Sequence, residues 1–193
     1  SMQREAEGSG SGAMIDRLGN IITNFHVVED ANKIQVTLAS NETFPAKLVG
    51  SDREQDIAIL KVEAPPEKLY PITMGRSDNL RVGQRVYVLG TPFGWGGTLT
   101  TGIISSLNRD LPSRVPGRDM QSLIQTDAAM NPGNSGGPLL DSNSRMIGMC
   151  VAIATKTGQT SSAAGDRPAT RIKQVVNDTN EHGDTVDACT PGR

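Results

Sequence analysis

The chain has 193 residues, a formal net charge of −2 and only 3% aromatic residues. No apolar run reaches the roughly 18 residues of a membrane span, and no basic excess marks a nucleic-acid-binding surface, which argues against both kinds of partner. The two cysteines, Cys150 and Cys189, lack CxxC spacing, so neither a metal site nor a disulfide framework is expected. Cys150 lies in an apolar run and is predicted to be a small buried residue.

The predicted elements are short and separated by turns. Residues 1–12 are polar and rich in glycine and serine, so we expect a flexible lead-in there. Apolar alternation and β-branched runs then predict strands, which in chain order cover residues 13–15, 20–23, 34–38, 46–49, 56–62, 84–89, 98–105, 122–126, 138–140 and 145–154. Residues 163–169 lack the apolar alternation of a strand. A short helix is expected over 170–177 and a disordered polar tail over 177–193.

The spacing of these elements indicates the fold class. The 21 glycines and 11 prolines supply many turns, and no helical pattern separates one predicted strand from the next. This arrangement favours an all-β sandwich or barrel. Turn formers cluster in residues 63–79 and mark an internal boundary. We therefore expect one folded domain over residues 13–176, with halves at about 13–70 and about 80–165.

Ser135 is the candidate nucleophile. It lies in the stretch NPGNSGGPLL, in which glycines and prolines bracket a single serine. Gly133 can adopt backbone angles that other residues resist. The N–H groups of Gly133 and Ser135, which flank Asn134, could then converge to form an oxyanion hole over residues 133–135. The alternative is a serine in an ordinary glycine turn, and the whole ten-residue string argues against it.

His26 and Asp56 are the candidate partners of this serine. A serine hydroxyl needs a base to take its proton, and imidazole titrates near neutral pH. His26, in ITNFHVV, is the histidine of the predicted folded region, with a core histidine as the alternative; His182 lies in the polar tail. Asp56 opens the strand DIAILKV and could hold the imidazole tautomer; a strand-capping Asp56, or Asp52 in its place, remain alternatives. The order His26, Asp56, Ser135 is that of chymotrypsin-type enzymes.

On these residues the chain resembles the protease domain of the HtrA/Deg family of trypsin-like serine proteases. The matching stretches are GNIITNFHVV, DIAILKV, LRVGQ, GTPFG, LTTGIISSLNR and QTDAAMNPGNSGGPLLDS. The resemblance implies two Greek-key, six-stranded β-barrels of the chymotrypsin/trypsin-like type with the active site between them, and a mobile regulatory loop over 109–120. It assigns the general base to His26, the orientation of that base to Asp56 and the nucleophile to Ser135.

The resemblance also implies partners and a location. Family members commonly form homotrimers and degrade unfolded proteins, and the mechanism needs no metal and no cofactor. Relatives occur in plastid, periplasm and mitochondrion. The stretch LTTGIISSLNR is most similar to plant and cyanobacterial members, which favours the chloroplast. We expect no nucleic-acid partner and no membrane span.

A substrate pocket follows from the same resemblance. Its residues would be Ala129, Met130, Val151, Ala152 and Ile153. In trypsin-like enzymes the acid that selects Lys or Arg sits six residues before the serine, and Ala129 occupies that position here. A basic side chain would be buried without a charge partner, which is costly. We expect cleavage after small or medium aliphatic residues.

The sequence departs from the family in three places. The family begins with a strand upstream of the GSG segment, where we expect only a flexible lead-in here. Residues 163–169 do not resemble the family's final strand, and no PDZ domain is expected after residue 177. An alternative function is therefore a latent protease-fold protein that binds unfolded polypeptides as a chaperone does. A small-molecule esterase would need a GxSxG elbow between strand and helix, which is absent.

Overall fold

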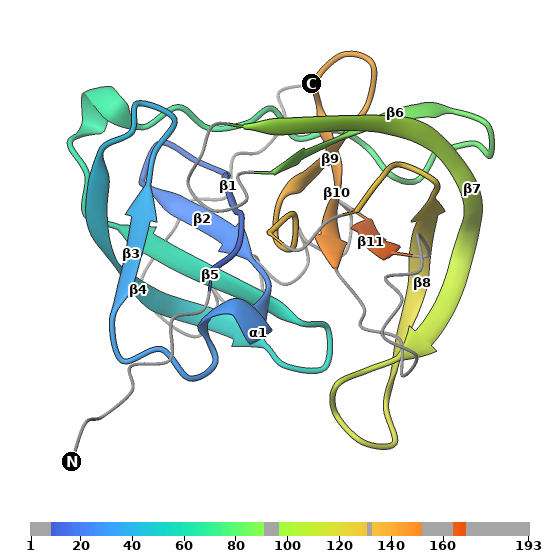
Figure 1. The fold of residues 1–193 in the computed structure, drawn as a ribbon, viewed down its shortest axis with the longest axis horizontal. Coiled ribbons are helices and arrows are strands. Elements are labelled where there is room, and N and C mark those ends of the chain that lie inside the picture. The colour runs from blue at the N-terminus through green and yellow to red at the C-terminus, as the bar shows by residue number, and fades with distance from the viewer. Residues whose placement is uncertain (1–8, 91–96, 131–132, 152–163, 169–193) are drawn as a thin grey trace.

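The computed structural model describes residues 9–90, 97–130, 133–151 and 164–168, which form two β units side by side (Figure 1). The first unit is an antiparallel sheet in the order β1-β2-β5-β4-β3. Its strands are β1 (Ala13–Met14), β2 (Asn20–Thr23), β3 (Ile34–Thr37), β4 (Thr43–Asp52) and β5 (Ile57–Val62). A short helix, α1 (Phe25–Val28), follows β2 on the side that faces the second unit.

The second unit is a closed antiparallel barrel in the order β10-β11-β8-β7-β6-β9. Its strands are β6 (Arg85–Gly90), β7 (Thr98–Pro112), β8 (Asp119–Thr126), β9 (Pro138–Leu140), β10 (Met146–Val151) and β11 (Ala164–Pro168). Because the sheet closes on itself, every strand has a partner on both sides, which removes the exposed edges that an open sheet would leave.

The all-β fold class and its two-unit division are confirmed, with two differences in strands. Among the described residues the first unit has five strands instead of the predicted six. β11 is a strand although residues 163–169 lack strand-like alternation, so that prediction was wrong. Its backbone pairs with β10 on one side and β8 on the other, and such pairing overrides a weak local preference. The predicted helix at 170–177 lies outside the described residues.

A shared apolar core holds the two units together. It combines side chains of β1, β2 and β5 with side chains of β9 and β10, namely Ala13, Ile22, Ile57, Ile59, Leu140, Met146 and Met149. Burying each large side chain of this kind contributes about 1.5–3 kcal/mol before the entropic cost of folding. The position of one unit relative to the other is therefore set by packing at this joint.

The segment between β5 and β6 runs along the same joint. It contains a short 3-10 helix, η1 (Pro66–Lys68), and then bonds to both units. The N–H of Ile72 donates to the carbonyl of Met14 in the first unit, and the N–H of Gly75 donates to the carbonyl of Met146 in the second, both at 2.8 Å. Neither helix in the described part of the chain is long and apolar enough to cross a membrane.

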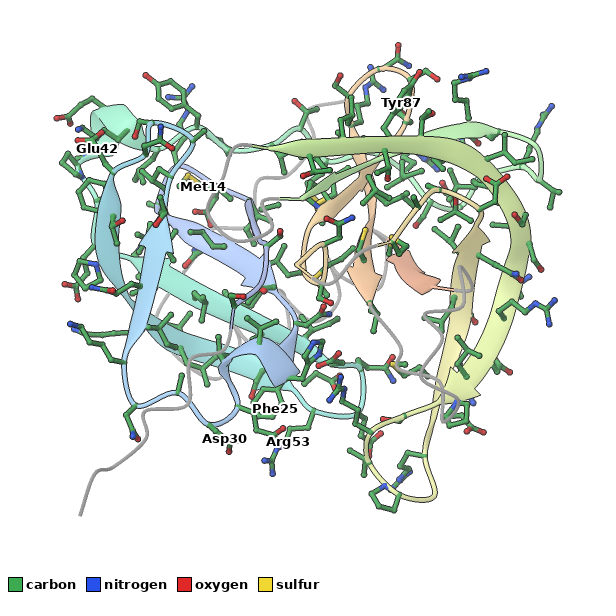
Figure 2. The ribbon with its side chains drawn as sticks, in the orientation of Figure 1. Met14, Phe25, Asp30, Glu42, Arg53 and Tyr87 are labelled. Atoms are coloured by element: carbon green, nitrogen blue, oxygen red, sulfur yellow. The ribbon has the colours of Figure 1, made fainter. Side chains whose placement is uncertain are left out.

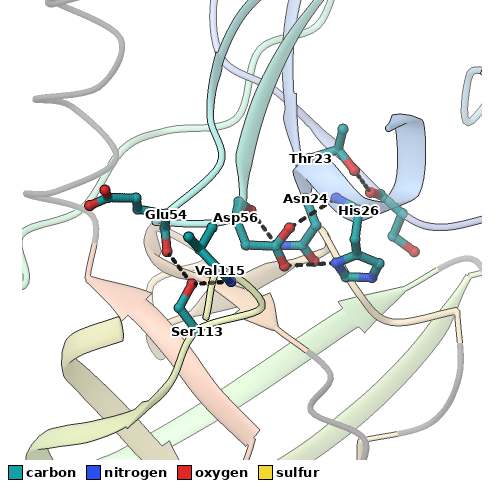
Figure 3. Close-up of polar contacts among 8 residues, drawn as sticks. Thr23, Asn24, His26, Glu54, Asp56, Ser113 and Val115 are labelled. Carbon is teal, nitrogen blue, oxygen red and sulfur yellow. Dashed lines mark hydrogen bonds and ion pairs between the residues drawn. The ribbon is translucent and has the colours of Figure 1, made fainter. Parts of the chain in front are cut away.

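The β7–β8 hairpin differs from the loop implied by the resemblance. Residues 109–112 belong to β7 and residues 119–120 to β8, so only 113–118 form the turn. This turn reaches the first unit, where the Ser113 hydroxyl donates to the carbonyl of Glu54 at 3.0 Å (Figure 3). Arg118 Nε lies 3.4 Å from the Glu54 carboxylate.

Candidate active site

His26 and Asp56 are joined twice. The Asp56 carboxylate accepts the backbone N–H of His26 at 2.9 Å and lies 2.7 Å from ring Nδ1 of the same residue (Figure 3). The Asp56 residue is 3% exposed, and a buried carboxylate needs such partners. An ionised carboxylate only accepts hydrogen bonds, so Nδ1 is the donor. In the neutral imidazole this leaves Nε2 unprotonated and able to accept a proton.

The backbone of Asp56 is unusual in a way that aims its side chain. Its φ is +53°, in the left-handed region, which costs a non-glycine residue about 1–2 kcal/mol. Its carbonyl accepts two hydrogen bonds, from Asn24 Nδ2 at 3.0 Å and from the N–H of Phe25 at 3.2 Å. These hydrogen bonds join Asp56, just before β5, to Asn24 and Phe25, just before His26. They offset the strain and direct the carboxylate at the imidazole.

The alternative acid, Asp52, has different contacts. Asp52, at the end of β4, accepts the N–H of Gln55 at 2.8 Å and therefore stabilises its own turn.

The same turn also contacts α1 and the residue that follows it. Arg53 lies with its guanidinium 5.0 Å from the centre of the Phe25 ring and donates to Glu29 at 2.8 Å, and Figure 2 shows Phe25 and Arg53 together at the edge of the first unit.

Ser135 lies in a turn that requires glycine. In this Ser135 turn (residues 133–137), Gly133 has a φ of 101° and Gly136 a φ of 84°. The N–H of Gly137 donates to the Asn134 carbonyl at 2.9 Å, which closes the turn on itself. The turn is also bonded to β10, because the N–H of Gly136 donates to the carbonyl of Cys150 at 2.9 Å. Cys150 is fully buried, as expected from its apolar run.

The structure brings the predicted triad to one joint. A Cβ at Gly10 would lie 2.7 Å from Val27, the neighbour of His26, and 3.2 Å from the carbonyl oxygen of Ser135. Gly10 therefore lies between the side chain of Val27, which follows His26, and the backbone of Ser135. Among the described residues no hydrogen bond joins the Ser135 hydroxyl to the imidazole. In unliganded sites that bond is often long and tightens only when substrate is present.

Ser11 is a site residue that the sequence prediction missed. Residues 1–12 were expected to be a flexible lead-in, but Ser11 is 6% exposed and bonded to the Ser135 turn. Its N–H donates to the carbonyl of Ser135 at 2.8 Å, and its hydroxyl donates to the carbonyl of Gly133 at 2.6 Å. The glycines of this segment permit a close approach between backbones, so its glycine–serine composition could also have indicated a packed segment.

The predicted pocket residues fall into three groups. Ala129 is exposed and Met130 half-buried, just before the Ser135 turn, and the Thr100 hydroxyl donates to the Ala129 carbonyl at 2.9 Å. Val151 is 1% exposed and packs beside Met120 and Leu123, so its side chain belongs to the core of the second unit. The remaining two, at positions 152 and 153, lie outside the described residues.

The comparisons with known proteins define first a class and then a family. The family model that matches residues 10–149 is described as a trypsin-like peptidase domain. The chain is 49% identical over 170 residues to Protease Do-like 1, chloroplastic, of Arabidopsis thaliana, a match that covers 88% of this chain and 39% of that protein. It is 46% identical over 158 residues to a probable periplasmic serine endoprotease DegP-like of Pseudomonas fulva, covering 81% of this chain and 31% of that protein.

The solved structures agree with this assignment. The structure titled HtrA-type protease AlgW with decapeptide superposes with a TM-score of 0.79 at 39% identity, covering 90% of this chain and 52% of that chain. The chain therefore belongs to the HtrA/Deg family of trypsin-like peptidases. It spans about two fifths of the Arabidopsis protein and about a third of the Pseudomonas protein.

Proposed function

We propose that this chain acts as a serine endopeptidase on unfolded or damaged proteins, with His26, Asp56 and Ser135 as its catalytic triad. The observation that carries the proposal is the buried Asp56 carboxylate, which accepts both the backbone N–H of His26 and its ring Nδ1. These two hydrogen bonds fix the orientation of the imidazole ring and its tautomer, as a general base requires. The names of the relatives, a protease and a probable serine endoprotease, support the same activity.

The mechanism follows from these positions. Nε2 of His26 takes the proton of the Ser135 hydroxyl as Oγ bonds to the carbonyl carbon of the substrate, whose oxygen becomes an anion. The N–H groups of Gly133 and Ser135, on either side of Asn134, would bind that anion. The protonated imidazole then gives its proton to the leaving amine, which leaves an acyl-enzyme. Water attacks the ester with His26 again as base, and the acid product and free Ser135 are released.

Specificity is proposed from the side chain at position 129. Ala129 offers no charge, and the carboxylate of the neighbouring acid Asp127 is held toward β7, where it accepts the N–H of Ile103 at 2.7 Å. A Lys or Arg side chain would therefore lose its hydration without gaining a partner. We expect cleavage after small or medium aliphatic residues. A peptide-library digest that returned a Lys or Arg preference would contradict this.

Location and assembly are proposed from the relatives. Protease Do-like 1 and Protease Do-like 5 of Arabidopsis carry the word chloroplastic in their names, whereas the DegP-like proteins are named periplasmic. These names support an organellar or extracytoplasmic location, with the chloroplast favoured by the plant-like stretches of the sequence. A homotrimer is the proposed assembly, and sedimentation of the purified chain would test it.

A latent, chaperone-like protein is the second candidate. The observation that favours it is the sequence of residues 163–169, which does not resemble the final strand of the family. Such a protein would bind unfolded polypeptides and protect them from aggregation without cutting them. It would still fold with the same joint and the same His26–Asp56 pair.

The test is cleavage of casein by the parent chain and by Ser135→Ala. Loss of the nucleophile should lower the cleavage rate by about a millionfold. A fluorophosphonate probe should label Ser135 in the parent chain alone. Equal cleavage by both proteins would refute the proposal, since the activity would then come from another source. Neither cleavage nor labelling, combined with suppressed aggregation of a denatured client, would establish the latent binder instead.

A further inference from the structure

Ser11 attaches the Ser135 turn to the first unit by two hydrogen bonds. The Ser11 hydroxyl binds the carbonyl of Gly133 at 2.6 Å, and the Ser11 N–H binds the carbonyl of Ser135 at 2.8 Å. These carbonyls belong to the peptide groups immediately before and after the one that carries the Ser135 N–H. That middle peptide group is held from within the turn by Gly137, whose N–H donates to the Asn134 carbonyl. Three consecutive peptide groups are thus fixed in orientation.

Ser11 is in turn held by the first unit. The hydroxyl of Thr23, the last residue of β2, donates to the carbonyl of Ser11 at 2.7 Å. The Ser135 turn lies so close to Ser11 and Thr23 that position 136 requires glycine. A Cβ at Gly136 would lie 2.2 Å from the Ser11 carbonyl oxygen and 2.4 Å from the Thr23 hydroxyl. Thr23 lies three residues before His26. Two hydrogen bonds, from the Thr23 hydroxyl to the Ser11 carbonyl and from the Ser11 N–H to the Ser135 carbonyl, therefore connect the segment of His26 to the Ser135 turn.

We propose that Ser11 is a positioning residue for the reaction at Ser135. Its hydroxyl fixes the peptide group that follows Gly133, and its N–H fixes the one that follows Ser135. Between them lies the peptide group of the Ser135 N–H, one of the two N–H groups proposed to bind the substrate oxyanion. The inference rests on the proposed function, because those N–H groups matter only if Ser135 attacks a carbonyl. The residue touches neither the substrate nor the reacting atoms.

This role predicts which kinetic constant changes. The negative charge on the substrate oxygen develops only in the transition state, so misaligned N–H donors weaken the transition state more than the bound substrate. Removing a whole donor from an oxyanion hole costs about 10²–10³-fold in kcat. Loss of a residue that only aligns the donors should cost less, about 10- to 100-fold in kcat, with KM changed by less than about twofold.

The test compares Ser11→Ala with Thr101→Val. Each substitution removes one hydroxyl that donates to a backbone carbonyl, since the Thr101 hydroxyl bonds to the Val86 carbonyl at 3.1 Å in the second unit. Both should lower the melting temperature slightly. Only Ser11→Ala should lower kcat, and only Ser11→Ala should speed amide hydrogen exchange at Gly136 and Gly137. A Ser11→Ala variant with kcat within twofold of the parent, or with unchanged exchange in the turn, would overturn the proposal.

Failure of the proposed function would look different. The parent chain would then neither cleave casein nor react with the fluorophosphonate probe. Amide exchange still decides the role of Ser11 in that case. Faster exchange at Gly136 and Gly137 in Ser11→Ala would retain Ser11 as the residue that positions the turn. Unchanged exchange would overturn both proposals.

Discussion

The two halves of the proposed active site are held in different ways. The proposed base and its acid are bonded within the first unit, where the Asp56 carboxylate and carbonyl accept hydrogen bonds from residues 24–26. The Ser135 turn is bonded both to β10 of its own unit and, through Ser11, to the first unit. The first half is therefore self-contained, whereas the second depends on how the units meet. Four substitutions and one matched control test this difference, from the largest expected effect to the smallest.

The largest effect is expected from Asp56→Asn. The amide can accept one of the two His26 hydrogen bonds but cannot hold the ring tautomer as an ionised carboxylate does. We expect kcat to fall on the order of 10⁴-fold with little change in KM. Steady-state kinetics on an aliphatic peptide ester would measure the loss. A decrease of less than tenfold would mean that another group orients His26.

Gly136→Ala should disturb the dependent half. The new methyl group would combine a positive φ of 84° with contacts of 2.2 Å to Ser11 and 2.4 Å to Thr23. We expect a loss of about 2 kcal/mol or more in the free energy of unfolding, together with a large fall in kcat. Urea unfolding would measure the first and peptide cleavage the second.

Gly83→Ala is the matched control for this substitution. Gly83 has a φ of 85°, but a Cβ there would meet no described atom within 4 Å. It should pay only the backbone strain, about 1–2 kcal/mol, and retain the parent kcat. Similar losses of activity in both variants would show that strain alone, and not the contact with the first unit, explains the Gly136 result.

Asn24→Ala should disturb the self-contained half by a smaller amount. The substitution removes the Nδ2 donor to the Asp56 carbonyl and leaves the N–H of Phe25 as a donor to the same oxygen. We expect kcat to fall about tenfold and the free energy of unfolding to fall by about 1–3 kcal/mol. Amide exchange at Gly136 and Gly137 should stay as in the parent. Faster exchange there would show that the first half is not independent of the Ser135 turn.

Glu42→Gln is expected to have the smallest effect and sets the baseline. Hydrogen bonds from Lys68 and Ser40 hold the pKa of the Glu42 carboxyl below its ordinary value. A lowered pKa in the folded state stabilises the protein above the ordinary carboxyl range, and this contribution is lost as the pH falls through the lowered value. The parent should exceed the variant in melting temperature slightly at neutral pH and not at strongly acidic pH. An altered kcat in this variant would show that the kinetic assay responds to general stability.

The sequence predicted the strands of both units, because local patterns carry that information, and the proposed triad came from local motifs in the same way. The alternation around β3 and the buried run of β5 follow from side-chain burial on a sheet. The helical turn α1 was not predicted, since four residues give no periodicity to recognise. β11 was missed because its position comes from partners on both sides, which are distant in sequence.

The role of Ser11 was hidden for a related reason. A glycine–serine run is typical of a linker, and it is equally what a backbone needs in order to pass between two packed segments. Only the contacts distinguish the two, and they involve residues more than a hundred positions away in the chain. Val151 shows the same limit, since alignment with a family pocket does not say whether a side chain faces the pocket or the core.

The joint between the units is rich in sulfur, and this makes it sensitive to oxidants. Met146 and Met149 are fully buried in it, and the partly buried Met74 packs against them. Thioethers are soft and adapt their shape, so they let two rigid sheets fit together. Oxidation of Met74 would place a polar sulfoxide against this apolar surface. Peroxide could thus separate His26 from Ser135 and abolish catalysis without modifying any residue of the proposed triad.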